Sequence, residues 1–331
     1  MPEATIRDVA RRAAVSVASA SRALNGLNNI RPETRDRVLK AADELGYVPH
    51  AGARSLSLSR SHAIGVVLPD FHGEFFSEIV RGMDGEASRR GYLLLLSSMH
   101  EGSEQARVAL RAMRGRVDGL IVMAPHIDAA TLEDALPPRL PTLLINGPTA
   151  LAGRPGVRMD NARGVDAVMR HLMAAGRRRI VHVAGPEGNV DAQERAGAYR
   201  ASMKAHAPGA EPIVLAGNFT EEAGCEAARE ILDRGLSCDA VFAANDMMAI
   251  GCLQELRGAG VRVPDAIAVA GFDDVPLARH LGLTTVSARI VDLGALAVRR
   301  LIDALEGRTP DVVTELHEPE LVIRESTGAS T

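Results

Sequence analysis

Apolar residues recur at helical spacing in two short segments near the start of the chain. In the first segment they lie at positions i, i+3, i+4 and i+7, the spacing of one helix face: Ile6, Val9, Ala10 and Ala13. Thr5 precedes this helix and can cap it, because its hydroxyl can accept from an unpaired N–H of the first turn. Ser16 can cap a second helix, on which Ala20 and Leu24 share an apolar face. We therefore expect two helices joined by a turn at residues 13–15.

A third helix follows closely. Pro32 suits the first helical position, and Gly46 can take the left-handed conformation that ends a helix. Its apolar residues expected to face inward are Val38, Leu39, Ala42 and Leu45. On the second helix, Val17, Ala18 and Arg22 lie on a different face, where they are free to enter a DNA major groove. This arrangement predicts a helix-turn-helix unit that binds DNA, with a purely structural three-helix cap as the alternative.

From residue 62 onward, continuous apolar runs alternate with amphipathic segments. The runs predict strands in two series, 63–68, 92–96, 119–123 and 141–145, then 180–184, 213–216, 240–243 and 266–270, of which 63–68 is expected to be buried. In the second series, the intervening helices are expected at 162–175, 192–205, 221–234 and 247–258. Apolar strands between helices are typical of parallel, doubly wound sheets. The predicted fold class is therefore α/β, with an all-α head followed by a two-lobed core whose ligands bind beyond the carboxyl ends of the strands.

Charge separates the head from the core. The net charge is −4, but residues 1–60 contain ten basic and six acidic residues, against 28 basic and 36 acidic residues in the remainder. A basic head on an acidic body places phosphate binding in the head. The three cysteines and ten histidines show no metal-ligand spacing, and no segment is typical of a signal peptide or a membrane span. We expect a cytoplasmic protein without a metal or cofactor.

Several motifs along the chain carry a family resemblance. They are Glu33-Thr34-Arg35, Leu45-Gly46-Tyr47, Ala53-Arg54-Ser55-Leu56, Ile64-Gly65-Val66, Ala184-Gly185-Pro186, Ala244-Asn245-Asp246 and Gly271-Phe272-Asp273-Asp274. With the head motif, they resemble the LacI/GalR (lactose-repressor) family of bacterial transcription regulators over nearly the full length. The resemblance implies a homodimer on a pseudo-palindromic operator. Some members of the family form tetramers through a leucine heptad tail; this sequence shows no such heptads, so we expect a dimer.

The resemblance also implies a domain organisation. It predicts a helix-turn-helix DNA-binding domain at 1–48, a hinge helix or linker at 49–60, and an effector-binding and dimerisation core at 61–331. The core resembles the periplasmic sugar-binding proteins. Its lobes are expected at about 61–158 with 290–317 (N-lobe) and about 159–289 with 318–331 (C-lobe).

By resemblance, the DNA contacts come from the second helix and the hinge. Arg22 can donate two hydrogen bonds to a guanine, whereas Val17 and Ala18 can only meet thymine methyl groups or fill space. Leu56 resembles a hinge leucine that wedges into the minor groove, with a linker leucine packed on the core as the alternative. The full set of expected DNA-binding residues is Thr5, Ser16, Val17, Ala18, Ser21, Arg22, Asn25, Ala53 and Leu56.

The expected effector site lies at the strand ends of the core. Arg195 resembles an arginine that binds effector hydroxyls, and Asp273 resembles the acid that accepts from another hydroxyl. Phe219 and Phe75 are expected to form two aromatic walls of the site. Asn245 and Asn146 are expected to form its polar rim. Sugar-responsive relatives often carry Asp at the Asn146 position. The simpler alternatives are that Asn245 and Asp273 only cap a helix or turn, and that Arg195 is a surface ion-pair partner.

These observations predict a sequence-specific transcription regulator, a repressor released from DNA by a small carbohydrate-type effector. The alternatives are a repressor that needs a purine-type corepressor and, in another class, a solute-binding protein without a DNA function. An enzyme is not expected, because no G-x-S-x-G, P-loop or G-x-G-x-x-G motif occurs between a strand and a helix.

Overall fold

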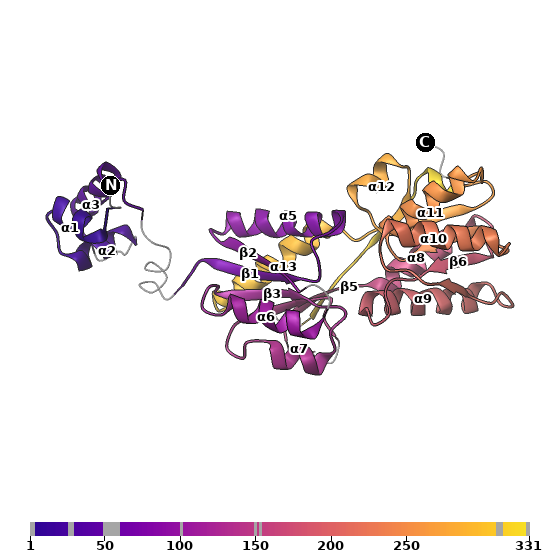
Figure 1. The fold of residues 1–331 in the computed structure, drawn as a ribbon, viewed down its shortest axis with the longest axis horizontal. Helices are drawn as coiled ribbons and strands as arrows, with labels where there is room; N and C mark the ends of the chain where they lie inside the picture. The colour runs from indigo at the N-terminus through magenta and orange to yellow at the C-terminus, as the bar shows by residue number, and fades with distance from the viewer. Residues whose placement is uncertain are drawn as a thin grey trace. The chain divides into compact units, whose positions relative to one another are not determined.

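The chain forms two compact units in the computed structural model, which describes residues 4–25, 30–48, 60–99, 102–148, 151, 154–308 and 314–328 (Figure 1). The first unit contains residues 1–63 together with 116–118. The second contains residues 64–115 and 119–331.

The first unit is built around three helices, α1 (Ile6–Arg12), α2 (Val17–Leu24) and α3 (Pro32–Glu44). Thr5 caps α1, and its backbone N–H donates to the carboxylate of Asp8 at 3.0 Å, which forms a capping box. The helices meet in a small core in which Val9, Ala20 and Val38 are fully buried. The three predicted helices are thus confirmed.

One part of the predicted packing of α3 is wrong. Leu39 is 46% exposed and Leu45 is 36% exposed, whereas Val38, Ala41 and Ala42 face the core. Leu39 follows Val38 directly, and adjacent residues on a helix point about 100° apart, so both cannot face the same core. Gly46 does end the helix as predicted, with φ of +60°.

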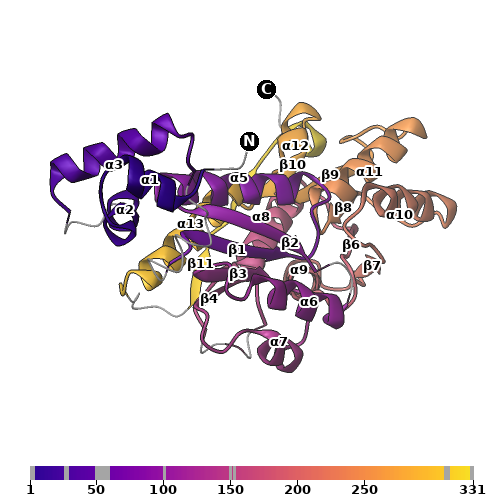
Figure 2. The ribbon, with the colours of Figure 1, turned by 60° about the vertical axis from the view of Figure 1, so that its left-hand side comes forward.

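The first lobe of the second unit is a six-stranded sheet with the order β11-β5-β4-β3-β1-β2. From β11 to β1, neighbouring strands pair in parallel. The strands are β1 (Ala63–Leu68), β2 (Leu93–Ser98), β3 (Gly119–Met123), β4 (Thr142–Ile145), β5 (Gly156–Met159) and β11 (Thr314–His317). Two helices, α5 (Glu74–Arg89) and α13 (Ile290–Leu305), pack together on one side, and α6 (Ser103–Met113) and α7 (Ala129–Ala135) pack together on the other (Figure 2).

The second lobe has a six-stranded sheet with the order β12-β10-β9-β8-β6-β7. Its strands are β6 (Ile180–Val183), β7 (Ile213–Leu215), β8 (Ala240–Ala243), β9 (Ala268–Asp273), β10 (Thr284–Ser287) and β12 (Glu320–Val322). The last strand is antiparallel to β10, and the other pairs are parallel. The helices are α8 (Asn161–Ala174), α9 (Val190–His206), α10 (Glu221–Asp233), α11 (Asp246–Gly258) and α12 (Pro276–His280).

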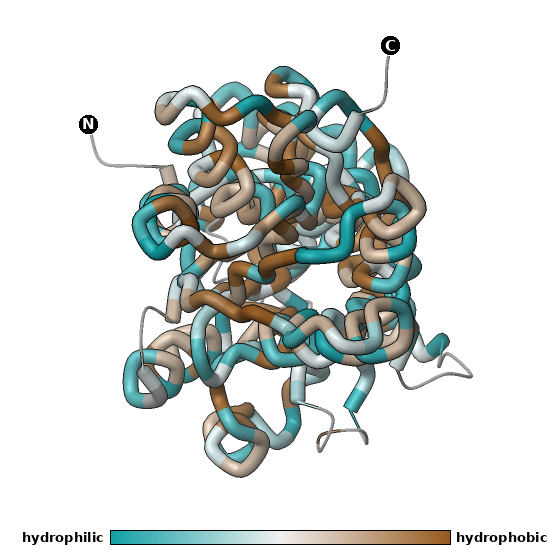
Figure 3. Tube along the Cα trace, turned by 90° about the vertical axis from the view of Figure 1, so that its right-hand side faces the viewer, coloured by the Kyte–Doolittle hydropathy of each residue, from teal (hydrophilic) through white to brown (hydrophobic). Residues whose placement is uncertain are grey.

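The predicted α/β class with parallel sheets is confirmed. The strands β1, β3, β4, β6, β8 and β9 are buried along their length, as their apolar sequences predict. Figure 3 shows hydrophobic (brown) and hydrophilic (teal) residues alternating along the coiled segments, as expected for amphipathic helices. The sequence did not predict β5, β10, β11 and β12. Through them the chain passes between the two sheets three times, after β5, after β10 and after β11.

The close packing of α5 on α13 depends on two glycines. A Cβ atom on Gly82 would lie 2.0 Å from the carbonyl oxygen of Val291, and a Cβ atom on Gly294 would lie 2.3 Å from that of Ile79. Both obstacles are backbone atoms of the partner helix, which cannot rotate away as a side chain would. The backbones of α5 and α13 are therefore in direct contact where the two helices cross. This contact joins two segments of the first lobe that are far apart in the sequence.

Substitution at this crossing provides a test of the packing. Gly82→Ala should lower the free energy of unfolding by about 1–3 kcal/mol, the usual range for overpacking. Gly85→Ala is the matched control, since Gly85 lies on the same helix and an added Cβ would meet nothing within 4 Å. The control should keep or raise stability, by up to ~1 kcal/mol from helix propensity. Urea unfolding followed by circular dichroism measures both; equal effects in the two variants would contradict the account.

Candidate functional site

The second helix of the first unit presents one face to solvent and buries the other. Ser16 caps it, with its Oγ accepting from the backbone N–H of Ser19 at 3.1 Å. Ala20 and Ala23 are buried, whereas Val17, Ala18 and Arg22 are exposed. The structure thus brings the three expected base-reading residues onto one exposed surface.

The other expected DNA-binding residues are placed less uniformly. Thr5 and Ser16 are exposed at the starts of α1 and α2, and Ser21 is half-buried. Asn25 ends α2, and its Nδ2 donates to the Oγ of Ser21 at 3.4 Å. Ala53 and Leu56, with the rest of the expected hinge at 49–59, lie outside the described residues.

The strand ends of the core contain unusual backbone conformations. Five non-glycine residues at or shortly after strand ends have positive φ angles, Asn146 (+47°), Phe219 (+71°), Asp273 (+116°), Asp274 (+59°) and Arg289 (+44°). Such angles are uncommon in non-glycine residues, and they persist only where surrounding structure holds them. Since backbone strain concentrates at binding and catalytic sites, this distribution supports a functional site at the strand ends.

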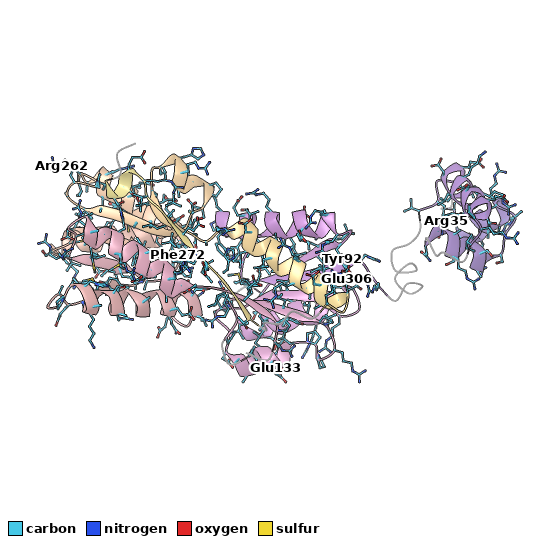
Figure 4. All side chains as sticks on the ribbon, turned by 180° about the vertical axis from the view of Figure 1, so that it is seen from behind. Arg35, Tyr92, Glu133, Arg262, Phe272 and Glu306 are labelled. Carbon is cyan, nitrogen blue, oxygen red and sulfur yellow. The ribbon has the colours of Figure 1, made fainter. Side chains whose placement is uncertain are left out.

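Arg195 is the centre of a buried polar cluster. It lies on α9 and is only 5% exposed, so the interpretation of Arg195 as a surface ion-pair partner is wrong. Its Nη1 donates to the carbonyl oxygen of Ala244 at 2.5 Å and lies 3.6 Å from Oδ1 of Asp273. Its Nε donates to Oδ1 of Asn161 at 2.8 Å. The guanidinium carbon lies 3.7 Å above the centre of the ring of Phe272, a cation–π contact (Phe272 is labelled in Figure 4).

Asp273 faces Arg195 in an unusual electrostatic environment. Burial raises the pKa of Asp273 to about 7, the charge of Asp191 adds to the rise, and the Arg195 guanidinium acts in the opposite direction. The carboxyl group therefore exchanges its proton close to neutral pH. A group in this state can donate or accept a hydrogen bond, depending on its protonation.

Two residues of the cluster were missed by sequence reasoning, Asp191 and Asn161. Asn161 donates from Nδ2 to Oδ1 of Asp191 at 2.8 Å, and Asn146 donates from its Nδ2 to Oδ2 of the same carboxylate at 3.1 Å. The amide oxygen of Asn146 accepts from the backbone N–H of Met159 at 2.9 Å. Asn161 could have been found only if β5 had been predicted, because it follows that strand. Asp191 precedes Arg195 by four residues, which places both on one face of α9.

Asn245 and Phe219 are joined directly. The Asn245 side chain caps α11 by accepting from the backbone N–H of Met248 at 3.0 Å, so a capping role is confirmed. Its Nδ2 also donates to the carbonyl oxygen of Phe219 at 2.9 Å. The Phe219 ring lies over Gly185, since a Cβ atom there would be 2.4 Å from the ring. Asn245 thus positions the segment that carries the aromatic ring.

Phe75 is placed differently from the other expected effector residues. It is half-buried on α5, and its ring contacts that of Phe76 edge to face, with 5.4 Å between centroids. The described contacts thus connect Phe75 to its neighbour on α5 rather than to Arg195.

Several hydrogen bonds connect the two lobes of the core. Besides the bond between Asn146 and Asp191, the backbone N–H of Val190 donates to the carbonyl oxygen of Pro125 at 2.9 Å. The carboxylate of Glu74 accepts from the backbone N–H of Leu277, also at 2.9 Å.

In the part of the chain that the structure describes, no helix is long and apolar enough to cross a membrane.

Comparisons with known proteins identify two domains. Residues 5–50 match the family model of bacterial regulatory proteins of the lacI family, and residues 169–327 match a periplasmic binding protein-like domain. The HTH-type transcriptional regulator CelR of Thermobifida fusca is 34% identical over 97% of this chain and 98% of its own length. The HTH-type transcriptional repressor CytR of Escherichia coli (strain K12) is 32% identical over 98% of this chain and 97% of its own length.

Solved structures of transcription regulators also resemble this chain over nearly its full length. A lac repressor dimer bound to operator and the anti-inducer ONPF is similar with a TM-score of 0.90 and 28% identity, over 99% of this chain and all of that one. The transcriptional regulator CelR in complex with cellobiose is similar with a TM-score of 0.72 and 32% identity, over 98% and 99%.

The unusual pKa of Asp273 predicts a pH dependence of stability. The folded protein retains this proton up to about pH 7, whereas an unfolded chain releases it near pH 3.8. Between these values the folded state binds more protons, so stability falls as pH rises. Relative to Asp273→Asn, the wild type should lose up to ~1.4 kcal/mol per pH unit across this window.

Urea unfolding of both proteins between pH 4.5 and about pH 7.5 measures this difference. Asp265→Asn is the control, because Asp265 is exposed. A constant difference between the wild type and Asp273→Asn over this range would show that Asp273 titrates normally.

Proposed function

Because the chain belongs to the lacI family of bacterial regulatory proteins, we propose that it is a repressor that binds operator DNA as a homodimer and is released by a small carbohydrate-type effector. It is a transcription regulator and not an enzyme. The observation that carries the proposal is the combination of an exposed α2 surface in a helix-turn-helix unit with a buried polar cluster at the strand ends of the core. Since it acts on DNA, we also propose a cytoplasmic location.

We propose that α2 reads the operator. Arg22 can form two hydrogen bonds with guanine O6 and N7, a contact typically worth ~1–3 kcal/mol of discrimination against other bases. Val17 and Ala18 offer only apolar contact, which suits thymine methyl groups. The remaining proposed contacts hold phosphates, sugars or the minor groove, and their residues are Thr5, Ser16, Ser21, Asn25, Ala53 and Leu56.

We propose that the effector binds at the Arg195 cluster. The guanidinium of Arg195 and the carboxyl group of Asp273 suit a polyol, which offers hydrogen-bond donors and acceptors side by side. Phe219 offers an aromatic face to a sugar ring. The proposed site is completed by Asn146, Asn245 and Phe75. Two relatives support a carbohydrate, since CelR has been solved with cellobiose and another relative is the ribose operon repressor of Halalkalibacterium halodurans, 32% identical over 98% of this chain.

We propose that residues 1–48 form the DNA-binding domain, residues 49–60 the hinge or linker, and residues 61–331 the effector-binding and dimerisation core. The three passages of the chain between the two sheets support the lobe boundaries near 158, 290 and 317. An effector held by residues of both lobes can favour one arrangement of the lobes over another, and it shifts DNA affinity only through such a difference.

We propose that the edge strand β2 belongs to the dimer interface. It is the last strand of the first sheet, and its Leu93 is 74% exposed, Leu95 40% and Leu96 44%. An edge strand with exposed apolar side chains is a ready site for pairing with another chain. A second copy of this chain fits, because the similar lac repressor structure is a dimer.

The DNA-reading role of Arg22 can be tested by substitution. Arg22→Ala should weaken binding to an operator selected from random-sequence DNA by about 10–100-fold, while binding to unrelated DNA falls much less. Fluorescence anisotropy at one salt concentration measures both affinities, since phosphate contacts depend on salt. Arg37→Ala, an exposed arginine on α3, is the control. An equal loss of affinity for both DNAs would make Arg22 a phosphate contact.

The dimer surface can be tested with a charge on the edge strand. Leu95→Asp should shift the protein towards monomers, because the carboxylate would have to be desolvated in the interface. The control is Leu316→Asp on β11, the opposite edge of the same sheet, where Leu316 is 60% exposed. Sedimentation velocity over a concentration series measures the association; identical behaviour of the two variants would place the interface elsewhere.

A further inference from the structure

Asp191 is a buried acid that the proposed effector site does not yet include. It lies in the first turn of α9 and is 7% exposed. Each carboxylate oxygen accepts one hydrogen bond, from Asn146 at the end of β4 and from Asn161 just after β5. An acid from the second lobe is therefore held by Asn146 of the first lobe and by Asn161, the first residue of α8 in the second lobe, which places it between the lobes beside Arg195.

The charges in this cluster are unbalanced. Arg195, Asp191 and Asp273 are all at least nine-tenths buried, so two acids share one guanidinium. The guanidinium is already engaged by Asn161, Ala244 and Asp273. Arg158, at the edge of the cluster, is paired with Glu194. Burial raises the pKa of both acids, and the Arg195 guanidinium opposes that rise; for Asp273, the charge of Asp191 adds to it.

We propose that Asp191 is a specificity-determining residue that, together with Asp273, restricts the effector to uncharged, hydroxyl-bearing molecules and excludes phosphate esters and carboxylates. This inference rests on the proposed function, because it concerns the effector of the same site. A carboxylate has about four lone-pair positions, so Asp191 can accept from effector hydroxyls in addition to its two amide partners. Hydrogen bonds to an ionised acceptor are roughly twice as strong as neutral ones.

An anionic effector meets the opposite situation. A phosphate group has no proton to offer to a carboxylate when fully ionised, and it would enter a site of low dielectric beside two acids. Burial of a charge is tolerated only with a partner of opposite sign. Because Arg195 is the guanidinium of the cluster and already faces Asp273, an added anion would compete with an existing carboxylate for it.

A purely structural role for Asp191 predicts something different. The acid stands near the N-terminus of α9, where a negative charge stabilises a helix, and it connects the lobes. Loss of such a role would lower stability and would weaken every ligand alike. A specificity role changes the ratio between the affinities for an uncharged sugar and for its phosphate ester, which a structural role would leave unchanged.

The test compares matched pairs of probes by isothermal titration calorimetry. The pairs are glucose with glucose 6-phosphate, galactose with galactose 6-phosphate, and ribose with ribose 5-phosphate, with cellobiose as an additional uncharged probe. The proteins are the wild type, Asp191→Asn, and Glu187→Gln as the control. Glu187 is an exposed acid in the loop before α9, so its substitution removes a charge of the same sign without entering the cluster.

The wild type should bind at least one of the three monosaccharides, and should bind it more tightly than its phosphate ester by about 100-fold or more. In Asp191→Asn this preference should fall by about tenfold, while Glu187→Gln should keep it within about twofold, because exposed charges are screened. Asp191→Ser removes the charge with a smaller side chain, and it should show the same fall.

Three results would overturn the proposal. They are wild-type binding of a phosphate ester as tight as that of its sugar, no binding of any uncharged monosaccharide probe, and an unchanged preference in both Asp191 variants. Operator binding by the same preparations keeps the two proposals apart. Wild-type protein that fails to bind operator would contradict the regulator function. With operator binding retained, a phosphate ester bound as tightly as its sugar or an unchanged preference in both Asp191 variants removes only the role of Asp191, whereas no binding of any uncharged probe also contradicts the carbohydrate-type effector.

Discussion

The core depends on the burial of one guanidinium group. Removing the charge of Arg195 from water is costly, and the cost is offset only when its donors are paired and an opposite charge lies near. Asn161 on α8, the carbonyl oxygen of Ala244 after β8, and Asp273 at the end of β9 supply these partners. Three elements are thus held at defined positions around α9, and the left-handed backbone of Asp273 is part of the same arrangement.

The same cluster explains how a ligand could change the relation of the two lobes. Asp191 links Arg195's helix to Asn146 of the first lobe, and Glu74 and Pro125 accept further bonds from the second lobe. A molecule with many hydroxyl groups can replace such bonds one by one, since each replacement exchanges one hydrogen bond for another. The lobe arrangement that makes the better set of bonds with the molecule then becomes more populated.

The sequence predicts most of the fold but only part of the cluster. Strands such as β1 and β3 are apolar throughout, so their burial is visible in the pattern. The strand β10 was missed because it contains Thr284 and Thr285, whose hydroxyls are satisfied by partners about 40 residues away. Asp191 was missed for the same reason, because its amide partners are 30 and 45 residues distant. Local patterns report burial of apolar groups, whereas buried polar groups depend on long-range partners.

The central claim is that the effector acts through Arg195. The most direct measurement is the operator affinity of Arg195→Ala with and without an uncharged sugar that releases the wild type, beside Arg200→Ala, an exposed arginine on the same helix. The account predicts that folded Arg195→Ala is less stable than the wild type, because its buried acids lose their guanidinium partner, but that it binds operator with wild-type affinity and is no longer released, while Arg200→Ala is released normally. Release of Arg195→Ala at the sugar concentration that releases the wild type would contradict the account.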